Sequence, residues 1–187
     1  MFYGDYKAAR DLAWRVLINE NIHSLPINTS RLCRGMGIVV RLYDPEDENS
    51  GCSCFINGVP NIFVSRSEPV LRQRFTVAHE LGHILLGHVG KYELVNREPS
   101  DHDNPIEQAA NVFAVRLLAP ACVLWGCGVD TADEITDICG ISRTAAEFRL
   151  KRMKELYKRG KFLLSPLERR VFEQFKGFIE EYKRQHN

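Results

Sequence analysis

Five residues of this chain could form most of a metal site and supply a base beside it. Residues 79–83 have the sequence His-Glu-Leu-Gly-His, the pattern His-Glu-x-x-His. An α-helix turns about 100° per residue, so histidines four positions apart lie on one face and both imidazoles can reach the same ion. Glu80 projects to one side of that face, where it can contact a water molecule on the metal. The pattern predicts a zinc site containing His79 and His83, with Glu80 as the general base.

The sequence around this pattern is typical of a helix. Pro69 stands near the expected start, and Gly87 and Gly90 follow the expected end. Between them, apolar or small residues recur at three- and four-residue spacing: Phe75, Ala78, Gly82 and Leu85. A helical histidine can also be a satisfied core residue or a surface group. The complete pattern in a helical frame favours the metal site over that interpretation.

A hydrolytic zinc site needs a third protein ligand, which must come from another part of the chain. The best candidate is Glu107, at the start of a second predicted helix, 107–118, which is bounded by Pro105 and Pro120. Ala110 lies on the same helical face as Glu107 and is small enough to allow a close approach to the first helix.

The position of Glu107 also has another interpretation. It follows Asn104 by three residues, so it could complete a capping box at the start of the helix instead of binding a metal. Asp101, His102 and Asp103 are further candidates for the third ligand. The spacing alone leaves these alternatives open.

The segments before the metal pattern predict an α+β fold. Helical periodicity predicts two helices, and runs of apolar and β-branched residues predict three strands; these elements are 5–18, 28–33, 38–43, 52–56 and 61–65. Asn57-Gly58 favours a β-hairpin between the last two strands. A strand beside the metal helix could hold an extended peptide substrate, provided that the last strand before the motif has a free edge there.

The composition is that of a globular protein with one core and space for a small appendage. The 187 residues are 44% hydrophobic and 26% charged. The charged N-terminus does not predict an export signal, and we expect no stretch with the eighteen or so apolar residues of a membrane span. The six cysteines show no disulfide framework, and Cys52 and Cys54 form only a weak metal signal. We therefore expect a cytoplasmic protein with reduced thiols and no membrane partner.

The C-terminal part predicts several helices. Residues 131–139, Gly140 and a segment from Ser142 give a helix-turn-helix outline. Basic residues of its second helix could contact phosphate groups: Arg143, Arg149, Lys151, Arg152 and Lys154. Residues 151–187 contain 11 Lys and Arg against 5 Glu. A solvated helix face explains this charge better than nucleic-acid binding, which is the minority interpretation.

A last helix is expected from Ser165, with Pro166 at its first position. Its aromatic stripe contains Phe172, Phe175 and Phe178. Core packing is the favoured interpretation of this stripe.

Two segments together resemble the ImmA/IrrE family of bacterial and phage metallopeptidases. Residues 74–83 are RFTVAHELGH and residues 107–120 are EQAANVFAVRLLAP. The family pattern is close to RFTLAHELGH followed by E-x-x-A-N-x-F-A-x-x-L-L-M-P. Ala119 replaces the usual methionine, which affects packing and not a ligand position. The resemblance covers roughly residues 5–157.

The resemblance implies a zincin-like fold and one Zn²⁺ ion bound by His79, His83 and Glu107, with Glu80 as catalytic base. We expect a metallopeptidase core in residues 1–125 and a helical extension, packed on it, in residues 126–187. The implied activity is site-specific cleavage of a protein, such as the transcriptional repressor of a mobile element or prophage. The alternative is a regulatory protein that keeps the zinc-site fold, binds DNA or a repressor, and does not cut.

Several supporting roles follow from positions near the motif. Tyr92, His88 and His102 are alternative donors to an oxyanion. His88 follows His83 by five residues and so points away from the metal face, which favours a surface or capping role. Asn111, one helical turn after Glu107, is expected to accept an imidazole N–H proton.

Overall fold

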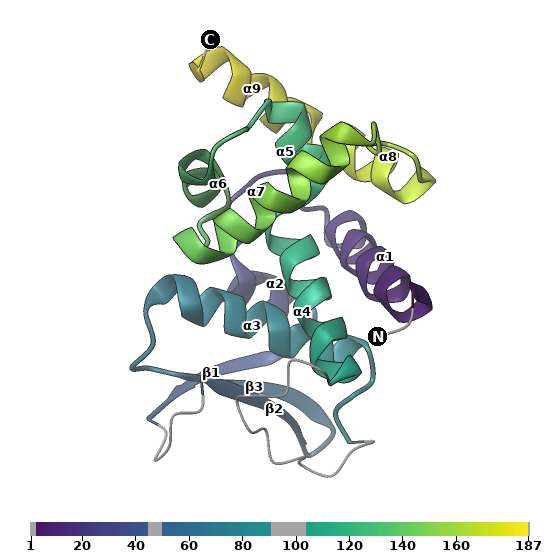
Figure 1. The fold of residues 1–187 in the computed structure, drawn as a ribbon. Helices are drawn as coiled ribbons and strands as arrows, with labels where there is room; N and C mark the ends of the chain where they lie inside the picture. Colours follow the sequence, from purple (N-terminus) through teal and green to yellow (C-terminus); the bar gives the residue numbers. More distant parts are fainter. Residues whose placement is uncertain (1–2, 45–49, 91–103, 187) are drawn as a thin grey trace. The chain divides into compact units, whose positions relative to one another are not determined.

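The computed structural model describes residues 3–44, 50–90 and 104–186, and it is mixed α+β (Figure 1). Three strands form one sheet and the other regular elements are helices, as predicted. The elements are α1 (Tyr3–Asn19), α2 (Thr29–Gly35), β1 (Val39–Tyr43), β2 (Gly51–Ile56), β3 (Val59–Ser65), α3 (Val70–Leu85), α4 (Pro105–Leu118), α5 (Ala121–Cys127), α6 (Ala132–Cys139), α7 (Arg143–Lys158), α8 (Pro166–Gln174) and α9 (Lys176–His186). Helix α5 was not predicted from the sequence.

The chain divides into two compact units. The first contains Met1–Arg10 and Asn28–Ala114, and the second contains Asp11–Ile27 and Val115–Asn187. Helices α1 and α4 each run from one unit into the other. The boundary expected between residues 125 and 126 falls inside α5, within the second unit, and the two-domain division stays a prediction.

The sheet of the first unit has the strand order β1-β3-β2. Strand β3 pairs in parallel with β1 and antiparallel with β2. Asn57 and Gly58, with φ of 50° and 77°, form the predicted turn between β2 and β3. The last strand before the motif therefore has neighbours on both sides, and the prediction that it offers a free edge to a substrate is wrong. In the described sheet, β2 is the edge strand of this hairpin.

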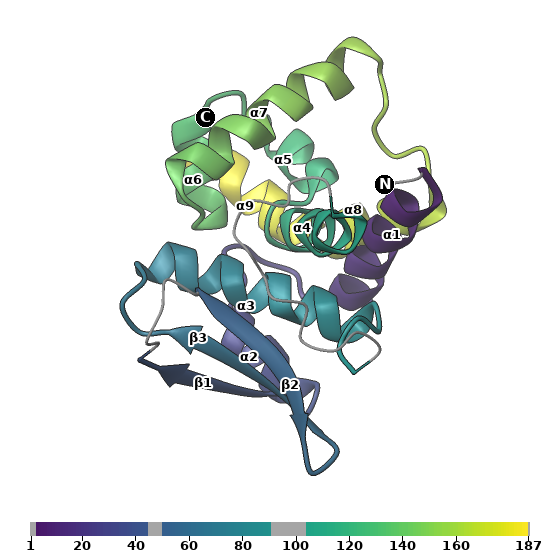
Figure 2. The same cartoon turned by 60° about the horizontal axis from the view of Figure 1, so that its bottom comes forward.

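Helix α3 carries the metal motif and packs on the sheet. It lies along one face against β2 and β3, and α2 packs against α3 and β1 (Figure 2). Pro69 occupies the N-cap position, and Gly87 with φ of 72° follows the end of the helix. The predicted helix boundaries are thus close to the observed ones. Its buried residues include Val77, Ala78 and Leu81, which form the apolar part of its packing face.

The second unit has caps at most of its helix starts. Thr131 and Glu134 form a capping box on α6, and Ser142 caps α7. Gly140, with φ of 58°, ends α6, so the helix-turn-helix outline is present as two short-linked helices. The last predicted helix is in fact two helices, α8 and α9, because the helix is interrupted at Phe175, the C-cap residue of α8.

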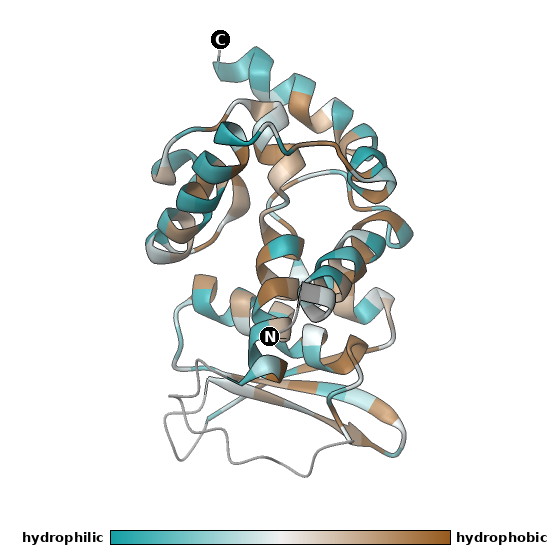
Figure 3. Ribbon diagram, turned by 45° about the vertical axis from the view of Figure 1, so that its right-hand side comes forward, coloured by the Kyte–Doolittle hydropathy of each residue, from teal (hydrophilic) through white to brown (hydrophobic). Residues whose placement is uncertain are grey.

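The aromatic stripe of α8 and α9 packs within the second unit, with Phe175 buried and Phe172 and Phe178 half-buried. Phe175 is fully buried, and Trp125 stacks on Phe162 with ring centroids 5.3 Å apart. A Cβ on Gly126 would lie 2.8 Å from Phe172 and 2.7 Å from Ile179, so the side chains of α8 and α9 pack closely on the backbone of α5. In Figure 3, hydrophilic residues cover most of α9, consistent with Ile179 as its buried residue. Core packing is therefore the role of the aromatic stripe.

One segment contradicts the expectation that no stretch of the chain is as long and apolar as a membrane span. Residues Pro105–Cys127 have the length and mean hydropathy, 1.6, of a membrane span. However, 78% of their most apolar window is buried inside the protein. A buried core helix passes the same test of length and composition, so this segment is explained by packing.

Candidate metal centre

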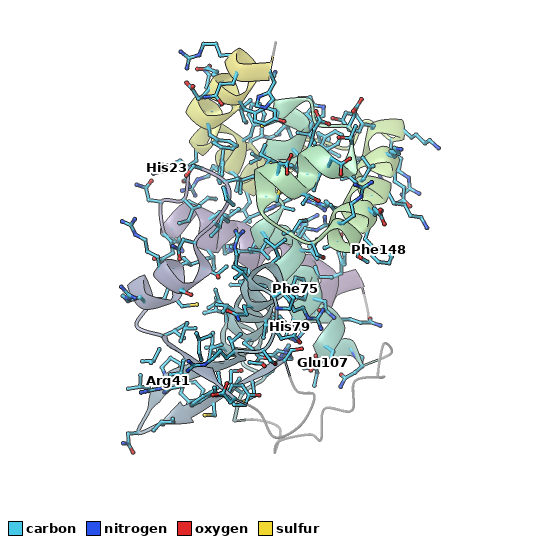
Figure 4. All side chains as sticks on the ribbon, turned by 90° about the vertical axis from the view of Figure 1, so that its left-hand side faces the viewer. His23, Arg41, Phe75, His79, Glu107 and Phe148 are labelled. Atoms are coloured by element: carbon cyan, nitrogen blue, oxygen red, sulfur yellow. The ribbon has the colours of Figure 1, made fainter. Side chains whose placement is uncertain are left out.

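Three side chains of the first unit converge on one point. The Nε2 atoms of His79 and His83 lie 3.0 Å apart. Glu107 places Oε2 3.1 Å from Nε2 of His79 and Oε1 3.3 Å from Nε2 of His83. Figure 4 shows His79 on α3 and Glu107 on α4 pointing toward one another. The structure thus brings together the three predicted ligands.

The separations of these atoms fit a tetrahedral zinc site. Zinc binds imidazole nitrogen and carboxylate oxygen at about 2.0–2.2 Å, and the corresponding tetrahedron has edges of about 3.3–3.6 Å. The observed separations of 3.0, 3.1 and 3.3 Å are close to these edges, with the Glu107 carboxylate turning one oxygen to each imidazole. The donor set and its spacing are therefore compatible with zinc, and occupancy by the ion stays a prediction.

The capping alternative for Glu107 does not match the structure. Asn104 caps α4, because its Oδ1 accepts a hydrogen bond of 2.9 Å from the Ile106 N–H. The Glu107 carboxylate contacts the two imidazoles instead. Hydrogen bonds to His79 and then His83 hold the pKa of Glu107 well below its usual range, against the opposite effect of burial. The rival ligands, residues 101–103, lie outside the described residues.

Both imidazoles are also held at their other nitrogen. Nδ1 of His79 lies 3.0 Å from Oδ1 of Asn111, the residue predicted to accept an imidazole proton. An amide oxygen accepts only, so this contact favours the tautomer with the proton on Nδ1, which would leave the lone pair of Nε2 to bind a metal ion. Nδ1 of His83 lies 3.1 Å from Nδ1 of His88. These contacts fix the orientation of both rings.

His88 combines the expected capping role with a contact that the sequence reasoning missed. Its backbone N–H donates to the His83 carbonyl at 2.9 Å and so closes the end of α3. Gly87, in the left-handed region, turns the chain back so that the His88 ring reaches His83. The other two oxyanion candidates, Tyr92 and His102, lie outside the described residues.

The predicted base, Glu80, is buried on the side of α3 that faces β2. Its side chain is 2% exposed, and Ser53 Oγ donates a hydrogen bond of 2.6 Å to its Oε2. Sequence reasoning did not single out Ser53. The alternation of Cys52, Ser53 and Cys54 along a strand was the available signal, because it puts Ser53 on the opposite face from the two thiols.

The helix geometry explains how α3 serves both the base and the ligands. At about 100° per residue, Glu80 lies about 80° to one side of the mean direction of His79 and His83, and Gly82 lies about 80° to the other side. Glu80 faces β2, and Gly82 faces α4, where an added Cβ would lie 3.0 Å from Phe113 and 3.3 Å from Ala110. The ligand face of α3 therefore lies between β2 and α4.

Two imidazoles and one carboxylate around a common point, with a second buried carboxylate next in sequence, define the class of metallopeptidase-like proteins. The chain belongs to the peptidase family described as IrrE N-terminal-like domain (Peptidase_M78), whose model matches residues 33–151. This range includes the sheet, the metal motif and Glu107. A comparison with curated proteins found no match.

Proposed function

We propose that this protein is a zinc-dependent endopeptidase that cleaves a specific protein substrate. The observation that carries the proposal is the triangle formed by His79, His83 and Glu107 beside the buried carboxylate of Glu80. Two histidines and one glutamate leave a fourth position on zinc for water or substrate, as a hydrolytic site requires. Membership of a peptidase family supports the same conclusion.

The residues would divide the chemistry as follows. A bound zinc ion supplies a Lewis acid that polarises a peptide carbonyl and lowers the pKa of water. Glu80 takes the proton of the attacking water and passes it to the leaving amine nitrogen. Asn111 and His88 keep the imidazoles of His79 and His83 in orientation through their Nδ1 atoms.

The proposed substrate is a cytoplasmic transcriptional repressor of a mobile element or prophage. This substrate class is supported by the resemblance of residues 74–83 and 107–120 to the ImmA/IrrE pattern.

A comparison of wild type with Glu80→Gln tests the activity. Both proteins are loaded with zinc, and their metal content is measured. Each is then incubated with a proteome-derived peptide library and with purified transcriptional repressors of mobile elements, and fragments are identified by mass spectrometry. Wild type should cut at defined bonds, whereas Glu80→Gln should keep zinc and lose at least about a hundredfold in rate, the contribution typical of a general base. Equal cleavage by the two proteins would contradict the assignment of this site as the peptidase active site.

The alternative is a regulatory protein that keeps the zinc-site fold and binds DNA or a repressor without cutting. The charges of α7 favour it less than the sequence suggested. Arg149 is buried and donates to the Ala119 carbonyl. Acidic partners neutralise two further arginines: Asp133 and Glu147 pair with Arg143, and Glu155 pairs with Arg152. A salt-dependent shift of duplex DNA by the metal-loaded protein, with no cleaved peptide, would favour the alternative.

A further inference from the structure

We infer that Ser53 is a positioning residue that holds the carboxylate of Glu80 for its role as base. The Ser53 hydroxyl donates a hydrogen bond of 2.6 Å to Glu80 Oε2. Both side chains are buried, with 5% of Ser53 and 2% of Glu80 exposed. The inference rests on the proposed function, because Ser53 acts through the base assigned there.

The packing of β2 against α3 places Ser53 at this position. A Cβ on Gly51 would lie only 2.5 Å from Cγ2 of Thr76, so the strand and the helix approach closely there. Two residues along a strand advance about 6.8 Å, and four residues along a helix advance about 6.0 Å. Ser53 and Glu80 are therefore the next pair after Gly51 and Thr76 along the contact between β2 and α3. Ser53 lies on the inward face with its register partner Ile62.

The hydrogen bond limits how the Glu80 side chain can turn. A carboxylate has two oxygens, and binding one of them fixes the direction of the other. A general base must lie within hydrogen-bond reach of the proton that it takes. Serine is well suited here, because its short side chain brings a donor to the carboxylate without separating β2 from α3. Loss of the hydroxyl leaves a buried carboxylate with one donor fewer and more rotational freedom.

The chain offers a matched control for this bond. Ser50 Oγ also donates a 2.6 Å hydrogen bond to a glutamate, Oε1 of Glu68, outside the metal motif. Ser50→Ala therefore removes the same type and length of bond at a site that contacts neither Glu80 nor the ligands in the described structure. Ser53→Thr keeps the hydroxyl and should rescue the function.

The experiment compares wild type, Ser53→Ala, Ser53→Thr, Ser50→Ala and Glu80→Gln, each loaded with zinc. Zinc content and thermal unfolding are measured first. Two probes follow: the library peptide that wild type cuts fastest, and acetohydroxamic acid, which chelates zinc and passes its O–H proton to a nearby carboxylate. The second probe reports on the Glu80 carboxylate without requiring proteolysis.

We expect Ser53→Ala to keep one zinc ion and to lose about tenfold or more in kcat, with KM changed less than about twofold, as for a lost hydrogen bond to a charged group. Its affinity for acetohydroxamic acid should fall about fivefold or more, and Glu80→Gln should show a larger loss. Ser53→Thr should restore both values to near wild type. Ser50→Ala should change neither.

Wild-type kcat and hydroxamate affinity in Ser53→Ala would overturn the inference, as would equal losses in Ser50→Ala. If Ser53→Ala does not fold, Ser53→Cys replaces it, because cysteine keeps the size but is only a weak donor. If hydroxamate binding depends on Ser53 and Glu80 but wild type cuts no peptide, the peptidase proposal fails and the role of Ser53 stands. A protein that binds no zinc overturns both.

Discussion

The two sides of α3 are packed in different ways. On the β2 side, a buried hydrogen bond joins Ser53 to Glu80. On the α4 side, Gly82 has no side chain, and Ala110 and Phe113 approach its backbone closely. One side therefore controls the base, and the other brings the helix that carries Glu107. Catalysis and metal affinity should respond separately to changes on the two sides.

The largest effect on zinc affinity should come from Glu107→Gln, and the same substitution at Glu80 is its comparison. Glu107→Gln keeps the size of the side chain but removes its charge, so zinc affinity should fall by more than about a hundredfold, since even changes in partners of the ligands cost about 10–100-fold. Glu80→Gln should keep zinc. Competition with a chelator of known affinity measures both. If Glu107→Gln binds zinc within tenfold of wild type, the third ligand lies elsewhere.

Gly51→Ala should strongly disturb the β2 side. The new Cβ would lie 2.5 Å from Cγ2 of Thr76 and 2.6 Å from the backbone oxygen of Phe63, so the strand must move. We expect the free energy of unfolding to fall by about 1–3 kcal/mol, the usual cost of overpacking. Denaturation by urea, followed by circular dichroism, measures this change.

Gly4→Ala is the control for Gly51→Ala, because nothing lies within 4 Å of a Cβ at Gly4 in α1. It should be neutral or slightly stabilising, since alanine favours a helix more than glycine does. A stable Gly51→Ala protein would show that β2 can move away from α3 at little cost, and would weaken the argument for the position of Ser53.

Asn111→Ala should have an intermediate effect, confined to the metal. It removes the acceptor 3.0 Å from Nδ1 of His79, so zinc affinity should fall about 10–100-fold while the fold is kept. Asn111→Asp retains an acceptor and should bind zinc at least as well as wild type. Equal affinities for all three proteins, in the same chelator competition, would mean that the contact does not orient the ring.

Much of the site could be predicted because its signals are local. The four-residue spacing of His79 and His83 fixes their common face, and Asn111 follows Glu107 by one helical turn. The α+β class and the hairpin followed from similar short-range patterns, such as Asn57-Gly58.

Contacts between elements distant in sequence could not be predicted in the same way. Strand order depends on pairing across the sheet, so the central position of β3 was missed. Ser53 meets Glu80 across 27 positions of sequence, and only the register of β2 along α3 brings them together. Similarly, Arg149 belongs to the basic residues of α7 by sequence, but its side chain is buried against the Ala119 carbonyl.

Gly82→Ala should give the smallest change, because it adds only one methyl group on the α4 side of α3. The new Cβ would lie 3.0 Å from the Phe113 ring and 3.3 Å from Ala110, so these neighbours must shift by only a few tenths of an ångström. Alanine gains up to about 1 kcal/mol in a helix interior, which offsets part of the crowding. The free energy of unfolding should therefore change by less than about 1 kcal/mol.

The same shift moves α4, which carries Glu107, so the zinc affinity of Gly82→Ala should fall severalfold, less than in Asn111→Ala. Its response to acetohydroxamic acid, once saturated with zinc, should match wild type, because Ser53 and Glu80 lie on the other side of α3. Chelator competition and urea denaturation measure the two effects in one preparation. Unfolding as severe as in Gly51→Ala would contradict the difference in packing between the two sides of the helix.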